Sequence, residues 1–429
     1  MVAKSLKAVI PYPVRGAISA VLAFLHLRQR FANGTRGVDL KIGLQVDVAV
    51  YFPDEMPKAY QLTQWLAILE HHPADLSFGL VVRDLDVYRQ LVKLTKLPVA
   101  YLPTFSELMK FYRSSPIKAV MYVNNGMGNF QSLTVAELAH IHVNHGESDK
   151  VCMVSNQVKA YDRVFVAGEA AVLRHRAALS EFNEKTLVRV GRPQLDENPP
   201  ASIPESSRRT ILYAPTWNGE DEANNYTSME FMGPKIVEAV LAQPNVRLIY
   251  KPHPRVAKPE TSQIKKHHRE IVRLIKRANA KDSGAGHEFR KTGDILAIFP
   301  RVDLLISDVS SIALDFLYLR TEAPIILTDR RNNVEQLHFD SPLSVATKVL
   351  TRENIADATS IIGQVLAADD FFKDRKVLRD FYFDNVRVGE SAPRFFKALR
   401  QVITEHSADV QRAKSLATKG TGPHFEHRT

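Results

Sequence analysis

A histidine lies between two cations in the stretch KPHPR, residues 251–255. The two prolines of this stretch prevent a helix from starting there and hold the turn extended, so the chain presents His253 rigidly. Lys251 and Arg255 on either side of the imidazole favour an anionic ligand such as a phosphate. A histidine that merely packs in a core would not take two charged neighbours. We therefore predict that His253 contacts a phosphate, with Lys251 and Arg255 beside it.

Two adjacent serines, Ser310 and Ser311, follow the apolar run LLIS (304–307) and Asp308, and they precede an apolar helical pattern. Either serine could cap the helix by accepting a hydrogen bond from its free N–H groups. A helix N-terminus after a parallel strand is also an anion site, because it combines N–H donors with partial positive charge. Beside a strand end that carries His253, the phosphate-binding interpretation is favoured, and we include Asp308 in this group.

A further strand end carries the stretch APTWNG, residues 214–219. Thr216 could donate a hydrogen bond to the phosphate or sugar of a ligand. It could equally close a local turn with its own backbone, and the sequence leaves both interpretations open. The predicted set of phosphate- or nucleotide-binding residues is therefore Lys251, Arg255, Thr216, Asp308, Ser310 and Ser311.

Three histidines lie in the stretch AHIHVNHGESDK, residues 139–150. His140 and His142 share one face of an expected strand, because side chains alternate along a strand with period two. His145 falls in the loop after the strand, next to Gly146, which lets a ligand approach closely. Because an imidazole titrates near neutrality, we predict that His145 is a general base. A zinc site would need a further ligand and none stands out, so we expect no metal and no cofactor.

These residues follow short β-rich runs that alternate with helical patterns. Such alternation predicts parallel sheets covered by helices, whose ligands bind beyond the carboxyl ends of the strands. The predicted fold class is α/β, with two Rossmann-like doubly wound domains and C-terminal helices. The expected strands are 46–53, 77–82, 98–103, 117–123, 140–146 and 162–168, followed by 210–217, 246–252, 304–307 and 324–329.

A polar stretch with three prolines, DENPPASIPESSRR (196–209), separates the two series and is interpreted as an interdomain linker. It divides the chain into a first domain of residues 1–197 and a second domain of residues 205–385. Terminal helices are expected over 386–410, and a frayed polar tail over 411–429. A chain of 429 residues is of the right length for two such domains.

The net charge of +10 favours an anionic partner, which could be a nucleic acid, a membrane surface or a phosphate-rich substrate. Nucleic acid is disfavoured, because the chain has no zinc-finger spacing and no RNA-binding aromatic motif.

No apolar run reaches the roughly 18 residues of a membrane span, and the segment 17–27 is too short. Residues 263–278 predict a basic amphipathic helix, which would suit solvent or an anionic membrane. The single cysteine, Cys152, excludes an internal disulfide and fits a reducing cytoplasm.

Five stretches in order resemble the CDP-glycerol glycerophosphotransferase family, the teichoic-acid primases and polymerases. They are HVNHGESDK, YDRVFVAG with GRPQLD, YAPTWNG, KPHP, and DLLISDVSSIALDFLYLRTEAPIILTD, within residues 117–330. The last stretch is the most specific. The chain departs from the family's pattern at residues 144–147, where the family usually has Trp-His-Gly-Thr. It departs again at Val309, where the family usually has a tyrosine.

The resemblance implies a GT-B arrangement of an acceptor-side first domain and a nucleotide-donor second domain. It implies transfer of glycerol phosphate, or a related polyol phosphate, from CDP-glycerol or a similar CDP-polyol to a hydroxyl of a lipid-linked acceptor, with release of CMP. By position, His145 matches the proposed base of the family, and His253 matches a histidine at the donor phosphates. Ser310 and Ser311 match hydroxyls at the diphosphate. The expected location of such a bacterial enzyme is cytoplasmic, peripherally at the inner face of the cell membrane.

Two other functions stay open from the sequence. One is that of a GT-B glycosyltransferase that uses a nucleotide sugar. The other is that of a non-catalytic protein of the same fold that binds an anionic polymer. Incubation with CDP-glycerol separates the three, because CMP appears only with the first.

Overall fold

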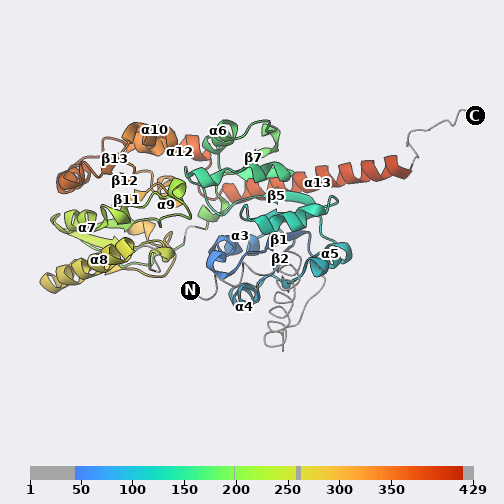
Figure 1. Cartoon of the computed structure of the whole chain (residues 1–429), viewed down its shortest axis with the longest axis horizontal. Helices are drawn as coiled ribbons and strands as arrows, with labels where there is room; N and C mark the ends of the chain where they lie inside the picture. Colours follow the sequence, from blue (N-terminus) through green and yellow to red (C-terminus); the bar gives the residue numbers. More distant parts are fainter. Residues whose placement is uncertain (1–43, 198, 258–261, 419–429) are drawn as a thin grey trace, which may run out of the picture.

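The computed structural model describes residues 44–197, 199–257 and 262–418, and these residues form two parallel β-sheets covered by helices (Figure 1). The two sheets lie in opposite halves of the molecule along its long axis (Figure 1). Each sheet, numbered from its own first strand, has the order 3-2-1-4-5-6, and the first sheet has a seventh strand at its end. This is the strand order of the doubly wound fold. The predicted α/β fold class with two doubly wound domains is confirmed.

The first sheet consists of apolar runs that are buried along their length, as parallel strands with helices on both faces require. Its order is β3-β2-β1-β4-β5-β6-β7. Its strands are β1 (Val48–Phe52), β2 (Phe78–Val82), β3 (Val99–Tyr101), β4 (Ala119–Tyr122), β5 (Ala139–His142), β6 (Arg163–Val166) and β7 (Leu187–Arg189). Its helices are α2 (Tyr60–Thr63), α3 (Leu66–Glu70), α4 (Leu85–Leu94), α5 (Phe105–Ser114) and α6 (Glu169–Ala178).

The second sheet repeats this plan in the order β10-β9-β8-β11-β12-β13. Its strands are β8 (Arg209–Ala214), β9 (Val246–Tyr250), β10 (Glu288–Phe289), β11 (Leu304–Asp308), β12 (Ile325–Asp329) and β13 (Lys348–Thr351). Its helices are α7 (Gly233–Leu241), α8 (Ser262–Lys281), α9 (Ser311–Leu319), α10 (Val334–Asp340), α11 (Ala358–Ala367) and α12 (Phe372–Phe383).

Local signals set where helices of the first domain begin. Asp84 caps α4, because its side chain accepts hydrogen bonds from the backbone N–H groups of Asp86 and Val87. Thr104 and Glu107 form a capping box at the start of α5. Each cap contributes about 1 kcal/mol to helix stability.

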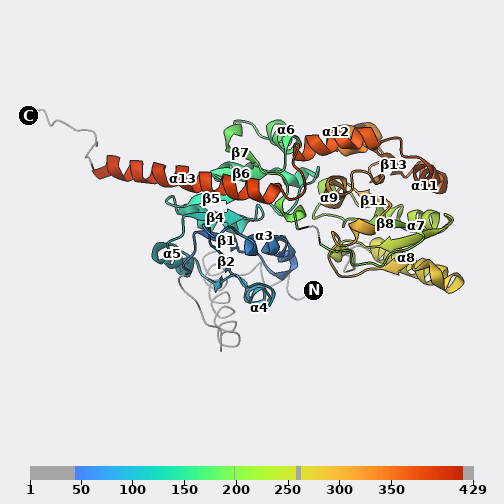
Figure 2. The same ribbon diagram turned by 180° about the vertical axis from the view of Figure 1, so that it is seen from behind.

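The last helix, α13 (Ser391–Thr418), returns from the second domain and runs along the first sheet (Figure 2). Phe395 and Leu399 are fully buried in the first core. The frayed tail predicted over 411–429 is therefore wrong for residues 411–418, which are helical. The packed first half of α13 provides the costly nucleus, and each further residue then adds a backbone hydrogen bond. The rest of the predicted tail, 419–429, lies outside the described residues.

Each expected strand coincides with a strand of one of the sheets, whereas β7, β10 and β13 were not expected. All three missed strands lie at edges of the sheets. Edge strands are covered on fewer sides, so they are shorter and need fewer apolar residues. Their sequences therefore lack the continuous apolar runs by which the central strands can be recognised.

In the part of the chain that the structure describes, no helix combines the length and apolar character needed to cross a bilayer. The apolar segment 17–27 lies outside the described residues. The basic amphipathic helix predicted over 263–278 is α8, which buries Ile264, Ile271 and Ile275 against the second domain.

Candidate active site

In the second sheet, the strand order changes direction between β8 and β11. Ligands of doubly wound sheets bind at this point, beyond the carboxyl ends of the strands. Thr216 follows β8, and Ser310 and Ser311 follow β11. The backbone N–H of Thr216 donates to an Asp308 carboxylate oxygen at 2.7 Å, which ties the two strand ends together. The structure thus brings the threonine and the two serines to one edge of the sheet.

The Asp308 carboxylate lies beneath this edge rather than on it. The residue has no exposed surface, and besides Thr216 it accepts hydrogen bonds from the Ser228 N–H at 3.1 Å and the Thr328 hydroxyl at 2.6 Å. A carboxylate is an acceptor and would repel a phosphate, and this one is enclosed by its own donors. We therefore correct its expected role from binding the ligand to holding the Thr216 loop.

Ser310 occupies the N-cap position of α9, yet its side chain accepts no hydrogen bond from the helix. Its hydroxyl lies 3.3 Å from that of Ser307 instead. Ser311 faces the first domain, since a Cβ placed on Gly146 would lie 3.3 Å from the Cβ of Ser311. The start of α9 is thus without a side-chain cap, which leaves its N–H groups for an anion.

His253 lies at the carboxyl end of β9, beside this site. Its Nδ1 accepts a hydrogen bond from the backbone N–H of Arg255 at 3.2 Å, so the neutral ring carries its proton on Nε2. Burial, followed by the positive charges of Lys150 and Arg255, lowers the pKa of His253 to about 3. His253 is therefore a neutral hydrogen-bond donor near pH 7.

The cations on either side of His253 have few close carboxylate partners. Lys251 is buried, and its Nζ donates to the backbone carbonyl of Thr292 at 3.3 Å, with no ion pair among the described residues. Arg255 lies over the Trp217 ring, 4.1 Å from its centre, and its carboxylate partner Glu220 is exposed and 3.8 Å away. Burying a cation without a counter-ion is costly, so this arrangement favours an anionic ligand.

His145 has the opposite tautomer. Its Nδ1 must donate to the backbone carbonyl of Val123, 3.3 Å away, because a carbonyl can only accept; Nε2 therefore keeps a free lone pair. Asn144 has a left-handed backbone with a φ of +55°, and its side chain accepts from the His145 N–H at 2.8 Å. Burial lowers the pKa of His145 to about 4. The ring is thus held neutral, with a nitrogen able to accept a proton.

Tyr60, the first residue of α2, stands between the two histidine rings. Its ring centre lies 5.8 Å from that of His145 and 6.2 Å from that of His253, with the rings edge-on in both cases. Nothing in the sequence distinguishes this tyrosine, because its position matters only once the two domains meet. One histidine from each domain thus faces a shared space that Tyr60 borders.

Lys150 is a second residue that the sequence analysis did not single out. It follows the His145 loop, and its Nζ donates to the Thr216 hydroxyl of the other domain at 2.9 Å. Burial lowers the pKa of its ammonium group. One signal could have found it, since Lys150 ends the stretch HVNHGESDK that carries the resemblance.

A model of the family described as CDP-glycerol:poly(glycerophosphate) glycerophosphotransferase matches residues 115–329, half of the 429 residues. The chain belongs to this family. The matched range contains both histidines of the site, Lys150 and the paired serines, whereas Tyr60 lies outside the glycerophosphotransferase match. No curated protein sequence matches the chain.

Solved structures of low sequence identity share the fold. A variant of the wall teichoic acid polymerase TagF soaked with CDPG superposes with a TM-score of 0.51 at 12% identity, over 83% of this chain and 88% of that chain. UDP-GlcNAc 2-epimerase from Neisseria meningitidis, bound to UDP-GlcNAc, gives 0.55 at 12% identity, over 83% and 100%. MnaA of S. aureus with UDP gives 0.53 at 14% identity, over 84% and 97%. These likenesses confirm a GT-B-like arrangement of this family member's two domains.

A buried ion pair joins the two domains of this glycerophosphotransferase-family chain beside the site. Nε and Nη2 of Arg192 each lie 3.2 Å from a carboxylate oxygen of Asp315 on α9, and both side chains are less than 10% exposed. Within the first domain, Arg174 of α6 pairs with Glu147 and Asp149 at 2.6 Å and 2.8 Å. The first pair ties Arg192 to α9, and the second ties Glu147 and Asp149 of the His145 loop to α6.

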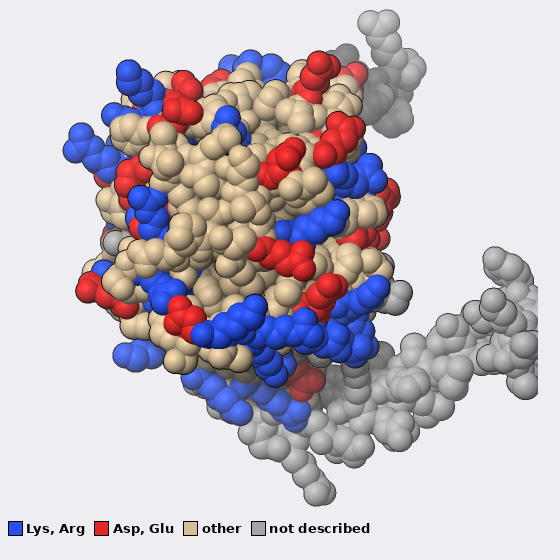
Figure 3. All heavy atoms as spheres, turned by 90° about the vertical axis from the view of Figure 1, so that its left-hand side faces the viewer, with Lys and Arg blue, Asp and Glu red and all other residues tan. Residues whose placement is uncertain are grey.

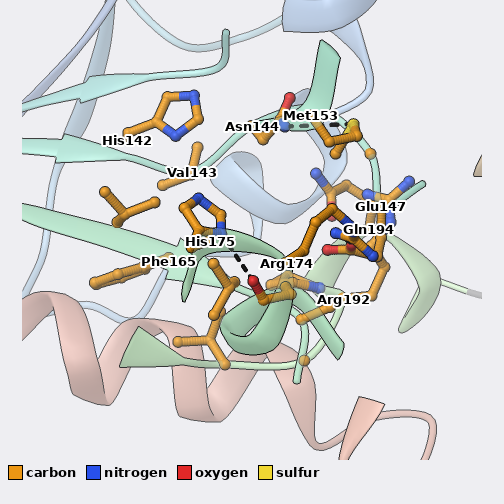
Figure 4. Close-up of a pocket in the computed structure, with 18 of the residues that line it drawn as sticks. His142, Val143, Asn144, Glu147, Met153, Phe165, Arg174, His175, Arg192 and Gln194 are labelled. Carbon is orange, nitrogen blue, oxygen red and sulfur yellow. Dashed lines mark hydrogen bonds and ion pairs between the residues drawn. The ribbon is translucent and has the colours of Figure 1, made fainter. Parts of the chain in front are cut away.

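A narrow cavity lies behind the His145 loop, with His142 at one end and Glu147, Arg192 and Gln194 gathered at the other (Figure 4). Its volume of about 30 Å³ has room for about two water molecules, which is too little for a nucleotide or a polyol. Neither ring nitrogen of His142 has a hydrogen-bond partner in the described part of the chain. Water held there would satisfy them, so we interpret the cavity as support for the loop.

The strand histidines do not converge on His145. The ring nitrogens of His140 contact the Tyr122 hydroxyl at 2.8 Å and the Val135 carbonyl at 2.9 Å. Within residues 44–197, 199–257 and 262–418, no group of three or more His, Cys, Asp or Glu side chains could hold a metal ion.

Acid should destabilise the fold through the two site histidines. Their pKa values, about 4 for His145 and about 3 for His253, lie below the ordinary 6.5, so the unfolded chain takes up protons that the folded state refuses. As pH falls from 6.5 to about 4, the free energy of unfolding should therefore fall. Urea denaturation at about pH 7.5, 6 and 5 measures this, and His253→Gln should reduce the slope. An unchanged slope in that variant would contradict the assigned pKa.

Proposed function

We propose that the protein transfers glycerol phosphate, or a related polyol phosphate, from a CDP-activated donor to a hydroxyl of a lipid-linked acceptor and releases CMP. The product would be teichoic acid or a related bacterial surface polymer. The observation that carries the proposal is the pair of neutral histidines with opposite tautomers, one from each domain, beside the cations Lys251 and Arg255. Membership of the glycerophosphotransferase family supports the choice of donor.

The donor's diphosphate would lie at the start of α9, where Ser310 and Ser311 offer hydroxyls and the helix offers N–H groups. Lys251 and Arg255 would bring positive charge to it, and charged donors form stronger hydrogen bonds to phosphate oxygens than neutral ones. His253 would donate to the same group from Nε2. The anion would thereby supply a counter-charge to Lys251, which forms no ion pair with any described residue.

The transfer needs a base on the acceptor and a stabilised leaving group. Nε2 of His145 would take the proton of the acceptor hydroxyl as the hydroxyl oxygen attacks the phosphorus that carries glycerol. The bond from that phosphorus to the bridging oxygen breaks, and its electron pair leaves with CMP. His253 and the start of α9 would stabilise the charge on the CMP phosphate. The negative donor would also raise the pKa of His145, which makes it a better base.

Incubation of the protein with CDP-glycerol and a lipid-linked polyol acceptor tests the proposal. We expect CMP to appear in proportion to the glycerol phosphate transferred. Release of a nucleoside diphosphate from a nucleotide sugar, without turnover of CDP-glycerol, would instead show a glycosyltransferase. Binding of anionic polymer without turnover of either donor would show a non-catalytic protein.

Replacing both Ser310 and Ser311 with alanine should weaken CDP binding by about 1–3 kcal/mol, the range for hydrogen bonds to charged groups. The melting temperature should change little, because Ser310 makes no capping bond in the structure. Calorimetric titration with CDP and thermal melting measure the two effects. A stability loss of about 1 kcal/mol with unchanged CDP affinity would mean that the serines only cap the helix.

The proposed acceptor lies in a membrane, and the basic face of α8 offers a way to reach it. Figure 3 shows Lys and Arg side chains gathered along the lower edge of the end of the molecule at which α8 lies. We propose that the protein is cytoplasmic and binds the anionic inner face of the cell membrane peripherally. The exposed basic residues of α8 are Lys265, Lys266, Arg269, Arg273, Lys276, Arg277 and Lys281.

The protein should co-sediment with anionic liposomes at low salt and detach at high salt, with weak binding to neutral liposomes. Each basic residue near an anionic surface contributes about 1 kcal/mol, and salt screens this attraction. Binding should fall when four residues of α8 become glutamine: Lys265, Lys266, Arg269 and Arg273. The matched control replaces four exposed lysines of the first domain: Lys93, Lys96, Lys159 and Lys185. Binding that survives both high salt and the α8 changes would show that α8 is not the anchor.

A further inference from the structure

Lys150 carries a positive charge that forms no ion pair with any described residue. The side chain is partly buried, and its Nζ donates to the Thr216 hydroxyl at 2.9 Å and lies 5.8 Å from the centre of the Tyr226 ring. A hydroxyl and an aromatic face replace only part of the hydration of an ammonium ion. Burial accordingly lowers the pKa of Lys150. Lys150 therefore carries its charge without an ion-pair partner among the described residues, which is unfavourable for a buried ammonium group.

The tyrosine whose ring Lys150 contacts carries a second donor without a partner. The Tyr226 hydroxyl is buried and has no hydrogen-bond partner in the part of the chain that the structure describes. The ring packs against Val309, the residue before Ser310, and the Arg331 guanidinium lies over it, 4.3 Å from its centre. Leaving a buried hydroxyl without a partner is unfavourable, so this tyrosine also points to a ligand with acceptor atoms.

Both groups lie at the point where the strand order of the second sheet changes direction. Thr216, which contacts Lys150, is tied through Asp308 to the strand that leads into Ser310. The charge of Lys150 also contributes to the low pKa of His253, so the two side chains are electrostatic neighbours. The Lys150 ammonium group meets the Thr216 hydroxyl here and lies over the Tyr226 ring, and a phosphate oxygen can accept from an ammonium group, an alcohol or a phenol.

We propose that Lys150, a residue of the first domain, binds the donor's diphosphate directly and that the Tyr226 hydroxyl donates to the same group. The inference rests on the proposed function and extends it, because the donor site is then completed by the domain that carries His145. A phosphate oxygen would take the place of the Thr216 hydroxyl as the partner of Lys150 Nζ. The new hydrogen bond would have charge on both sides, which makes it stronger than the one it replaces.

Calorimetric titration with CDP and with cytidine tests this role. Lys150→Gln should weaken CDP binding by about tenfold or more and leave cytidine binding unchanged, since only CDP carries the diphosphate. Tyr226→Phe should weaken CDP binding by a smaller factor. Lys185→Gln, which changes an exposed lysine of the same domain, should have no effect. The melting temperature of Lys150→Gln should be equal to or higher than that of the wild type, because an unpaired charge is removed.

The outcomes separate this inference from the proposed function. CDP binding by Lys150→Gln at wild-type affinity would overturn the inference and leave the proposed function standing. Equal losses of CDP and cytidine affinity together with a lower melting temperature would show a structural role and would also overturn it. A wild-type protein that does not bind CDP would refute the proposed function itself, and the inference with it.

Discussion

A His145→Ala variant is expected to release CMP from CDP-glycerol about 10²- to 10⁴-fold more slowly than the wild type, the range for loss of a general base. The hydrogen bond from Nδ1 to the Val123 carbonyl leaves Nε2 as the nitrogen that can take the acceptor's proton. CDP affinity should change little, because His145 is not among the proposed donor contacts, which are Lys150 and residues of the second domain. The melting temperature should stay within a few degrees, since a loop histidine contributes little core packing.

His71→Ala is the matched control, because His71 is an exposed histidine of the same domain whose ring pairs with Glu197 at the surface. It should release CMP at the wild-type rate. Initial rates across pH should show an acid limb in the wild type and in the control, and this limb should disappear with His145→Ala. Near-normal turnover by His145→Ala would mean that another group, or no group, takes the proton.

Asp315→Leu is expected to cause the largest loss of stability, about 3–5 kcal/mol, because it leaves the buried Arg192 guanidinium without its carboxylate. The pair connects the first domain with α9, so the loss should reach both domains. Tryptophan fluorescence during urea denaturation can follow each domain, since Trp65 lies in the first core and Trp217 in the second domain. The midpoints of both unfolding transitions should move to lower urea concentration.

The double variant Arg192→Met with Asp315→Leu is the control for this effect. Removing both charges leaves apolar side chains of similar size, and such replacements are often neutral or stabilising. The double variant should therefore recover most of the free energy of unfolding that Asp315→Leu loses. If Asp315→Leu lowers the free energy of unfolding by less than about 1 kcal/mol, the ion pair is more exposed to water than it is in the structure.

The central strands and their carboxyl ends could be predicted because short stretches of the sequence encode them. Apolar runs of five or so residues, bounded by proline and by polar residues, mark β8, β9 and β11 in the sequence as in the structure. The parallel fold then places the ends of these strands along one edge. His253, Thr216 and the serine pair could thus be expected to lie together before any distance was known.

The role of Asp308 could not be predicted from the local sequence. Its position after a strand end placed it among the ligand-binding residues. Its carboxylate turned out to be enclosed by donors from Thr216, Ser228 and Thr328, which are 20 to 92 residues away in the chain. Which way a side chain turns at a strand end depends on the donors that reach it, and those come from other elements.

The sequence by itself determined the α/β class, the two doubly wound domains and the strand ends that carry His145, His253 and the two serines. Periodicity and turn residues encode these features over short distances along the chain. Only the tertiary structure decided the opposite tautomers of the histidines and the places of Tyr60 and Lys150. Those features depend on contacts between residues far apart in the chain, and for Tyr60 and Lys150 on contacts across the two domains, which no local pattern records.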